Sequence, residues 1–322
     1  MARRPQDKDG TMTLARVMLG IDVSKTRLDS FSAASLAKAF ANEAAGIDRL
    51  VKLAQSLGAF VVFEATGGYE EALCLALEAA GIAYHLANPR KAREFARSAG
   101  FLAKTDQVDA RMLAAYGQAL DLPATQPRSP ACRQLGRLVG RRDQLVELRK
   151  IEKTRLRQTN EAWALDSLKQ VIAVLSEQIR RLEGLIERCI QADEALRRTR
   201  DIVRTAPGVG PVTAMVLMAE LPELGRIDRR AVAAIAGLAP LACDSGALRG
   251  KRRIWGGRKR LRDALYMAAL SASKGQVFRP GYEKMRAAGK PHKVALIAVA
   301  RKLLVGINAA MRQNQPFALM TA

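Results

Sequence analysis

The first third of the chain alternates short apolar runs with helical patterns, and this alternation restricts the fold more than any other feature. The strand-like segments are residues 17–22, 27–32, 35–41, 59–63 and 82–87. Helical spacing of apolar residues is found in residues 44–57, 70–80 and 90–119. A meander of strands that passes into alternating helices and strands predicts an α/β domain with a mixed sheet.

The rest of the chain has an almost wholly helical pattern. Three prolines in residues 123–130 predict a linker. Leucine and isoleucine then recur at helical spacing through residues 131–163 and 165–200, which predicts a long helical hairpin or coiled coil with a role in oligomerisation. The predicted fold class is therefore α/β plus all-α. The predicted boundaries are 1–14 for a basic N-terminal extension, 15–125 for the α/β domain, 126–200 for the helical linker and 201–322 for a mostly helical C-terminal domain.

The positive charge of the chain is concentrated in its second part. The formal net charge is +22, yet residues 1–130 hold 16 basic and 14 acidic side chains. The remaining excess lies in residues 131–322, and residues 245–302 alone hold 16 basic and two acidic side chains. Such an excess predicts a polyanion partner. A solvated basic surface is the alternative, but Ile254 and Trp255 interrupt the run with apolar side chains.

The cysteines and the apolar runs indicate the compartment. Four widely spaced cysteines with no CxxC pair predict reduced thiols rather than a disulfide framework or a zinc site. No run approaches the roughly 18 uncharged apolar residues of a membrane span. The basic first residues lack an apolar leader segment. We therefore expect a soluble, cytoplasmic protein without a membrane partner.

Four acidic residues stand where a metal site could form. Asp22 ends the first predicted strand, and Glu64 ends a central one. Asp106 and Asp109 are spaced so that both lie on one face of a helix. Carboxylates that converge repel one another unless a cation lies among them, and hard oxygen ligands favour Mg²⁺ or Mn²⁺. Each acid also has a structural alternative, since Asp22 could start a turn and Asp106 could cap a helix.

Two features of the C-terminal region suit phosphate contacts. Gly208 and Gly210 form a turn like that of a helix-hairpin-helix motif, where backbone N–H groups can approach a phosphate without reading sequence. A helix junction without a ligand is the alternative. Ser245 precedes a dense cationic run, which a serine nucleophile in phosphoryl transfer would need, although a Ser-Gly pair usually marks only a turn. The basic residues expected to bind nucleic acid are Lys104, Arg249, Lys251, Arg252, Arg253, Arg258, Lys259 and Arg260.

Three segments closely resemble the DEDD transposases of bacterial insertion sequences, and more narrowly the insertion sequence 110 family. They are residues 20–25 (Gly-Ile-Asp-Val-Ser-Lys), 64–69 (Glu-Ala-Thr-Gly-Gly-Tyr) and 104–111 (Lys-Thr-Asp-Gln-Val-Asp-Ala-Arg). The resemblance extends over nearly the whole chain. It implies a RuvC-like ribonuclease H fold for the first domain and a C-terminal transposase domain. The acidic tetrad that it implies consists of Asp22, Glu64, Asp106 and Asp109, as ligands of Mg²⁺.

The same resemblance implies a function. Members of the family are guided by a bridge RNA, and a serine that corresponds to Ser245 becomes linked to DNA. Their sites are assembled between subunits, with dimers pairing into a tetramer on the RNA and on donor and target DNA. We therefore expect an RNA-guided, site-specific DNA recombinase of the bacterial cytoplasm. Two alternatives stay open: a metal-dependent, structure-selective endonuclease with Ser245 structural, and a nucleic-acid-binding scaffold without activity.

Overall fold

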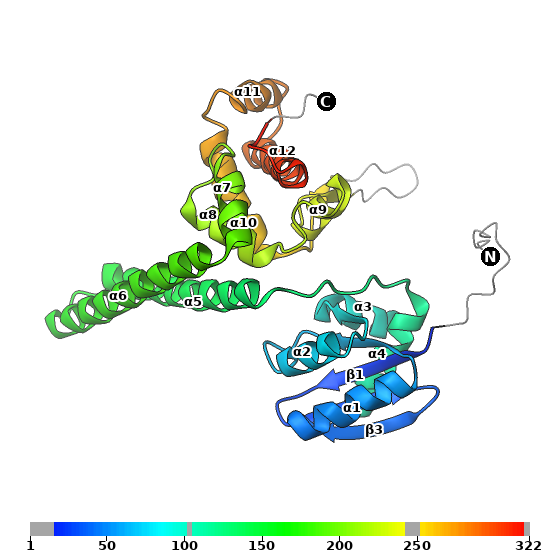
Figure 1. The fold of residues 1–322 in the computed structure, drawn as a ribbon. Helices are drawn as coiled ribbons and strands as arrows, with labels where there is room; N and C mark the ends of the chain where they lie inside the picture. Colours follow the sequence, from blue (N-terminus) through cyan, green and yellow to red (C-terminus); the bar gives the residue numbers. More distant parts are fainter. Residues whose placement is uncertain (1–15, 102–104, 242–251, 319–322) are drawn as a thin grey trace. The chain divides into compact units, whose positions relative to one another are not determined.

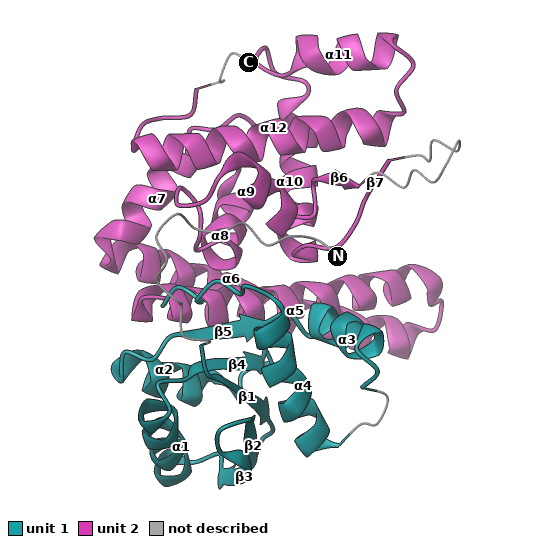
Figure 2. Cartoon of the chain, turned by 90° about the vertical axis from the view of Figure 1, so that its right-hand side faces the viewer, with its two compact units in different colours: residues 1–127 teal, residues 128–322 magenta. Residues whose placement is uncertain are grey.

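The computed structural model describes residues 16–101, 105–241 and 252–318. The chain divides into two compact units, residues 1–127 and 128–322, which Figure 1 and Figure 2 show. Unit 1 combines strands and helices, whereas unit 2 is almost wholly helical. The long helical hairpin belongs to unit 2, together with the C-terminal helices.

Unit 1 is built on one five-stranded sheet. Its strands are β1 (Met18–Val23), β2 (Arg27–Ser32), β3 (Leu36–Ala41), β4 (Phe60–Glu64) and β5 (Tyr84–Ala87). The strand order is β3-β2-β1-β4-β5. The first three strands form an antiparallel meander, and β4 and β5 continue the sheet from β1 in parallel. The mixed sheet predicted from the sequence is confirmed.

Helices cover both faces of this sheet (Figure 2). The helices are α1 (Ala44–Ser56), α2 (Glu71–Ala79), α3 (Pro89–Ser98) and α4 (Asp106–Ala119). Leu19 and Ile21 of β1 pack with residues of α1 and α2, whereas Phe60 and Val62 of β4 pack with residues of α3 and α4. Successive strand residues point to opposite faces. The even-numbered residues of β1 and β4 therefore face α4.

The helical pattern of residues 90–119 is divided into two helices. Gly100, at φ 79°, follows the end of α3. Thr105 is the N-cap of α4, and its side chain accepts a hydrogen bond from the N–H of Val108. This cap satisfies one of the N–H groups that have no partner within the helix. Asp106 is thus the first residue of α4 and does not cap it.

Unit 2 joins a helical hairpin to a bundle of shorter helices. The hairpin consists of α5 (Pro130–Gln158) and α6 (Ala162–Ala192). The bundle consists of α7 (Glu194–Arg204), α8 (Pro211–Glu220), α9 (Arg229–Ile235), α10 (Lys259–Ala272), α11 (Arg279–Ala287) and α12 (His292–Gln313). Two short antiparallel strands, β6 (Pro240–Leu241) and β7 (Arg253–Ile254), form a ribbon beside it.

The break between α6 and α7 lies inside residues 165–200, which the sequence pattern joins into one helix. Asp193 ends α6 and begins α7. Its carboxylate accepts a hydrogen bond from the N–H of Leu196, 2.9 Å away. An N-cap aspartate of this kind favours the start of a new helix over continuation of the old one.

α12 is the core helix of the bundle. Leu303 and Leu304 are fully buried, and they pack with residues of α8, α9 and α10. Of the helices described in the structure, α12 alone has the length and hydropathy of a membrane span. The buried apolar residues of α12 are accounted for by packing within unit 2.

Candidate active site

The register of the sheet brings three acidic side chains to one face. Ile21 of β1 lies beside Phe63 of β4, so the next residues, Asp22 and Glu64, end neighbouring parallel strands. On the other side of β1, Asp22 lies directly opposite Asp29 of β2. Side chains of directly opposed residues share a face of the sheet. All three carboxylates thus lie on the face that α4 covers.

Gly20 allows α4 to lie close to this face. A Cβ atom at residue 20 would lie 2.1 Å from the carbonyl oxygen of Ala110 and 2.4 Å from the backbone nitrogen of Ala114. Only glycine fits where two backbones approach so closely. Gly20 is two residues before Asp22, on the same face of β1. The close contact therefore holds the beginning of α4 near the ends of the strands.

The first turn of α4 contributes two further acids, Asp106 and Asp109. Carboxylates are stabilised at this position because the N-terminus of a helix carries partial positive charge. With Thr105 as the cap, their i, i+3 spacing places both on one face of α4, as the sequence predicts.

Burial and mutual repulsion raise the pKa of two of these carboxyl groups. The pKa of Asp22 is raised to about 6, first by burial and then by the charges of Asp109 and Asp106. The pKa of Glu64 is also raised, first by burial and then by the charges of Asp109 and Asp22. The strand ends and the first turn of α4 therefore form one electrostatic site.

The donor set of this site fits a hard divalent cation by ligand type and charge, because it is made of carboxylates whose charges repel one another. Among the residues that the structure describes, no three Asp, Glu, His or Cys side chains are close enough together to hold a metal ion. The four acids act on one another electrostatically without forming a coordination sphere. A bound cation would have to draw them together.

Sequence reasoning missed two residues of this site, Asp29 and Arg27. Asp29 is 4% exposed, and its charge contributes to the raised pKa of Asp22. The Nη2 and Nε atoms of Arg27 donate hydrogen bonds to Oδ1 of Asp29, at 2.6 and 3.0 Å. The strand-like pattern of residues 27–32 and its short distance from the first strand were the available signal, because a tight hairpin sets Asp29 opposite Asp22.

The predicted serine site lies partly outside the described residues. Ser245, Arg249 and Lys251 lie in residues 242–251, which the structure does not describe. Lys104, in the first unit, also lies outside the described residues. The chain enters the segment from β6 and leaves it through Arg252 into β7. Arg252 and Arg253 are exposed, as expected of side chains that could contact a phosphate backbone.

The ribbon is joined to the bundle where two backbones cross. A Cβ atom at Gly237 would lie 2.3 Å from the carbonyl oxygen of Gly256, and one at Gly257 would lie 2.2 Å from the nitrogen of Gly237. All three glycines have positive φ angles. Arg262 of α10 donates a hydrogen bond to the same Gly256 carbonyl. The segment between β7 and α10 is therefore packed closely against Gly237, which follows the end of α9.

Arg258, which we expected to bind nucleic acid, is engaged within unit 2. Its Nη1 and Nη2 atoms donate to the two carboxylate oxygens of Glu223 at 2.8 and 2.7 Å, and Nη1 also donates to the backbone carbonyl of Glu220. The pKa of Glu223 is lowered despite its burial, because Arg258 stabilises the charged form. This bidentate ion pair orients the start of α10.

Arg260 is likewise engaged. Its guanidinium group donates to Asp143 at 2.6 Å, to Glu220 at 2.8 Å and to the backbone carbonyl of Val139 at 2.7 Å. These bonds join α10 to α5 and α8. Lys259, between the two arginines, is exposed and paired with Asp263 at 2.6 Å. Arg258 and Arg260 thus stabilise the fold, and their contact with nucleic acid stays a prediction.

The glycine turn before α8 is used mainly for packing. A Cβ atom at Gly208 would lie 2.4 Å from the carbonyl oxygen of Ala268 in α10, and Gly208 has a φ of 78°. Gly210 is the N-cap of α8 and has open space around its Cα atom. The close approach that Gly208 permits is therefore to α10, and contact of either glycine with a phosphate stays a prediction.

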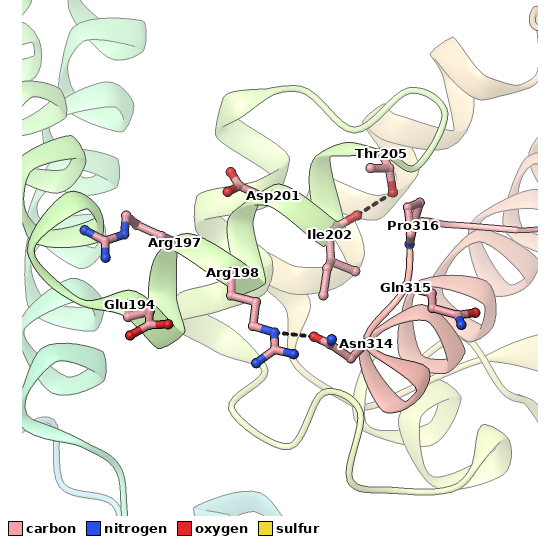
Figure 3. A pocket seen from close by; sticks show the side chains of 9 residues that line it. All are labelled: Glu194, Arg197, Arg198, Asp201, Ile202, Thr205, Asn314, Gln315 and Pro316. Atoms are coloured by element: carbon pink, nitrogen blue, oxygen red, sulfur yellow. Dashed lines mark hydrogen bonds between the residues drawn. The ribbon is translucent and has the colours of Figure 1, made fainter.

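A surface groove of about 630 Å³ lies elsewhere in unit 2, between α7 and residues 314–316 (Figure 3). Arg198 donates a hydrogen bond across it to Asn314. The groove is lined by both acidic and basic side chains, among them Glu194 and Arg197. None of the predicted site residues lines it.

Two sequence models of transposases match the chain. A model of the DEDD transposases of IS110 elements, described as "Transposase", matches residues 19–162. A second, described as "Transposase IS116/IS110/IS902 family", matches residues 200–283. The first match contains the four predicted acids, and the second contains Ser245 and the basic run that follows it.

The chain is also similar to named proteins along most of its length. It is 30% identical to the "Pilin gene-inverting protein" of Moraxella bovis, over 94% of this chain and 98% of that protein. It is 31% identical to the protein of the same name from Moraxella lacunata, over 80% of this chain and 81% of the relative. Over 46% of this chain and 36% of the relative, it is 30% identical to an uncharacterized 43.6 kDa protein of insertion element IS110 from Streptomyces coelicolor.

Proposed function

This chain belongs to the IS110 family of transposases, and on that premise we propose that it is an RNA-guided, site-specific DNA recombinase that acts through a transient covalent serine–DNA intermediate. Membership in the family makes it a DNA-processing enzyme. The observation that best supports the chemistry is the convergence of acids from β1, β4 and the first turn of α4 on one face of the sheet.

In this proposal Asp22, Glu64, Asp106 and Asp109 hold Mg²⁺ or Mn²⁺. The bound ion supplies positive charge that polarises the scissile phosphate and stabilises the charge that develops on its oxygens. The role of the chain is to bring four carboxylates together from three elements, which the strand register and the Gly20 contact support. The raised pKa of Asp22 and Glu64 is the electrostatic cost of that arrangement before a cation is bound.

Ser245 is the proposed nucleophile. Its Oγ atom would form a bond to the phosphorus of a DNA phosphodiester while the bond from phosphorus to one deoxyribose oxygen breaks. The serine proton would leave to a base, and the departing oxygen would gain a proton. Attack by a deoxyribose hydroxyl on the serine phosphodiester would then rejoin DNA and release Ser245. The exposed Arg252 and Arg253, next to this segment in the chain, support the placement of a phosphate there.

The charge of unit 2 supports binding of both DNA and a guide RNA. The chain is rich in cations that suit phosphate backbones but only 5% aromatic, so it has few side chains for stacking on single-stranded bases. This composition agrees with sequence choice by base pairing to a guide RNA, with the protein holding the duplexes by backbone and shape. The name of the Moraxella relatives supports DNA inversion as one outcome of recombination by this chain.

The hairpin of α5 and α6 supports self-association, which we propose to produce a dimer that assembles into a tetramer. Leu135 and Ile190 are buried at the end of the hairpin that packs with α7 and α8. Farther along, Ile151, Val174 and Trp163 are 41%, 61% and 76% exposed. Exposed apolar side chains on two adjacent helices favour contact with a second copy.

Replacing Ser245 tests the nucleophile. We expect the unaltered protein, incubated with its DNA, its guide RNA and Mg²⁺ and then denatured, to yield a protein–DNA adduct that resists detergent, and we expect Ser245→Ala to yield none. Ser271→Ala is the matched control, because Ser271 is an exposed serine of α10 without a following cationic run. It should form the adduct as the unaltered protein does.

Strand cleavage by Ser245→Ala at the normal rate would overturn the serine mechanism. It would favour a metal-dependent endonuclease in which water attacks the phosphate. Asp109→Asn tests the third alternative, a scaffold without activity. The recombinase and the endonuclease should both lose DNA cleavage in this variant, whereas a scaffold would cleave no DNA before or after the change.

A further inference from the structure

We propose that Asp29 is a fifth carboxylate of the acidic site and that Arg27 is its resident counter-cation, so that the two members of one ion pair tune the affinity of the site for a divalent cation in opposite directions. This inference rests on the proposed metal-binding role of the acids at the ends of β1 and β4. It assigns to β2 a part in that role.

Asp29 belongs to the site by position. It lies directly opposite Asp22 in the antiparallel pair of β1 and β2. Side chains in such a pair stand on the same face of the sheet, roughly 5 Å apart at their Cβ atoms. The side chain of Asp29 is 5% exposed, so water screens its charge poorly. A buried carboxylate beside another carboxylate needs a nearby positive charge.

Arg27 supplies that charge. Its guanidinium group contacts Asp29 through two nitrogen atoms, the closer at 2.6 Å, while the side chain remains 50% exposed. The charge of Asp106, in the first turn of α4, also acts on Arg27. Arg27, the first residue of β2, therefore holds its charge against Asp29 and within the field of the acidic site. Glu64, at the other side of the site, is under the influence of a different cation, Arg93.

The pair has opposite electrostatic effects on a cation bound by the four acids. The positive charge of Arg27 repels that cation, and the negative charge of Asp29 attracts it. One unit charge several ångströms from a divalent ion, in a partly screened protein environment, changes its affinity on the order of tenfold. In the unaltered chain the two effects largely cancel. The pair therefore neutralises the buried charge of Asp29 in the absence of metal without strengthening the affinity of the site for a divalent cation.

Charge-neutralising variants of the full-length chain test this proposal, with Mn²⁺ alone as the probe and no DNA. Free Mn²⁺ is measured by electron paramagnetic resonance during titration. We expect Arg27→Gln to bind Mn²⁺ on the order of tenfold more tightly than the unaltered chain, and Asp29→Asn on the order of tenfold more weakly. In the double variant the two opposite charges are removed together, and we expect the affinity to return near that of the unaltered chain.

An exposed ion pair of the same unit provides the matched control. Lys52 pairs with Asp48 at 2.9 Å on α1, and both side chains are more than half exposed. Lys52→Gln and Asp48→Asn should leave the affinity for Mn²⁺ unchanged. Arg27→Lys keeps the charge and should bind Mn²⁺ like the unaltered chain, and far-ultraviolet circular dichroism establishes that each variant is folded. Should Arg27→Gln fail to fold, the comparison of Asp29→Asn with Arg27→Lys decides the proposal.

The outcomes distinguish this inference from the proposed function. If the unaltered chain binds no Mn²⁺, or if Asp109→Asn binds it equally well, the metal site itself is wrong. If the unaltered chain binds Mn²⁺ through its acids and both members of the Arg27–Asp29 pair shift the affinity in the same direction, or neither shifts it, the pair is only structural and the inference is overturned.

Discussion

Asp22 is held in surroundings that oppose its own ionisation. It is partly buried at the end of β1, beside Asp29 and within the field of Asp106 and Asp109. Its pKa is raised from 3.8 to about 6. A carboxylate placed in this way stabilises a bound cation but weakens the fold when no cation is present. Asp22 therefore lowers the stability of the metal-free fold at a position where its charge favours binding of a cation.

The pH dependence of stability follows from this shift. An aspartate with a raised pKa binds its proton more tightly in the folded chain than in the unfolded chain, so the contribution of Asp22 to stability is fully present below pH 3.8 and is lost as pH rises to about 6. We expect the metal-free protein to lose this contribution by neutral pH. Asn cannot ionise, so Asp22→Asn should raise the melting temperature at pH 7 in EDTA and should abolish DNA cleavage.

Thermal unfolding of both proteins at a series of pH values checks this. The melting temperature of Asp22→Asn should exceed that of the unaltered chain increasingly from pH 4 to pH 7. A difference that is constant with pH, or one of opposite sign, would contradict the burial of Asp22 among like charges.

At the scale of elements, the position of α4 determines whether the acids meet. The helix lies against β1 at Gly20, where a Cβ atom would lie 2.1 Å from a carbonyl oxygen of α4. In unit 2, ion pairs hold the start of α10. Arg258 pairs with Glu223, which follows α8, and Arg260 pairs with Asp143 of α5 and Glu220 of α8. Both contacts bring segments that are distant in the chain to a defined place beside predicted site residues.

Gly20→Ala tests the importance of the α4 contact. The added methyl group must push α4 from β1, and overpacking of this kind costs about 1–3 kcal/mol. We expect a lower melting temperature together with a loss of DNA cleavage, because the displaced helix carries Asp106 and Asp109 away from Asp22. Circular dichroism and a cleavage assay measure the two effects.

The control for this substitution is Gly136→Ala in α5, where an added Cβ meets no atom within 4 Å. Alanine is a better helix former than glycine by up to about 1 kcal/mol. The variant should therefore be as stable as the unaltered chain or more stable, with normal cleavage. If Gly20→Ala behaved like this control, the close approach of α4 and β1 would not be required.

At the scale of the whole molecule, unit 2 presents charged and apolar surfaces that its own fold leaves exposed. Unit 2 carries most of the net positive charge of the chain, and Arg252 and Arg253 are exposed on its surface. The far part of its hairpin exposes Val174 and Trp163. These features suit a protein that works in an assembly with nucleic acid and with further copies of itself.

Val174→Glu tests self-association through the hairpin. Burial of a valine side chain contributes about 1.5 kcal/mol, so placing a charge there should raise the dissociation constant of the oligomer at least about tenfold. Gln178→Glu is the control, because it adds the same charge at an exposed polar position of α6. Sedimentation velocity should show dissociation of Val174→Glu alone, and equal association of all three proteins would exclude this surface.

The sequence by itself determined the features that depend on local pattern. Apolar runs of strand length predicted the mixed sheet, and leucine spacing predicted the long helices of the hairpin. Acids at the ends of those runs pointed to Asp22 and Glu64, because neighbouring parallel strands end at the same edge of a sheet. The predicted strands and helices are confirmed, because periodicity can be read within a few residues, and the role of the two acids stays a prediction.

Only the tertiary structure decided which side chains share a site. Asp29 joins the acids because of the register between β1 and β2, and Arg260 is occupied by Asp143, 117 residues away in the chain. The break between α3 and α4 depends on a cap at Thr105 that the helical pattern does not display. Register, long-range ion pairs and close backbone contacts arise from the packing of distant segments, so no local pattern contains them.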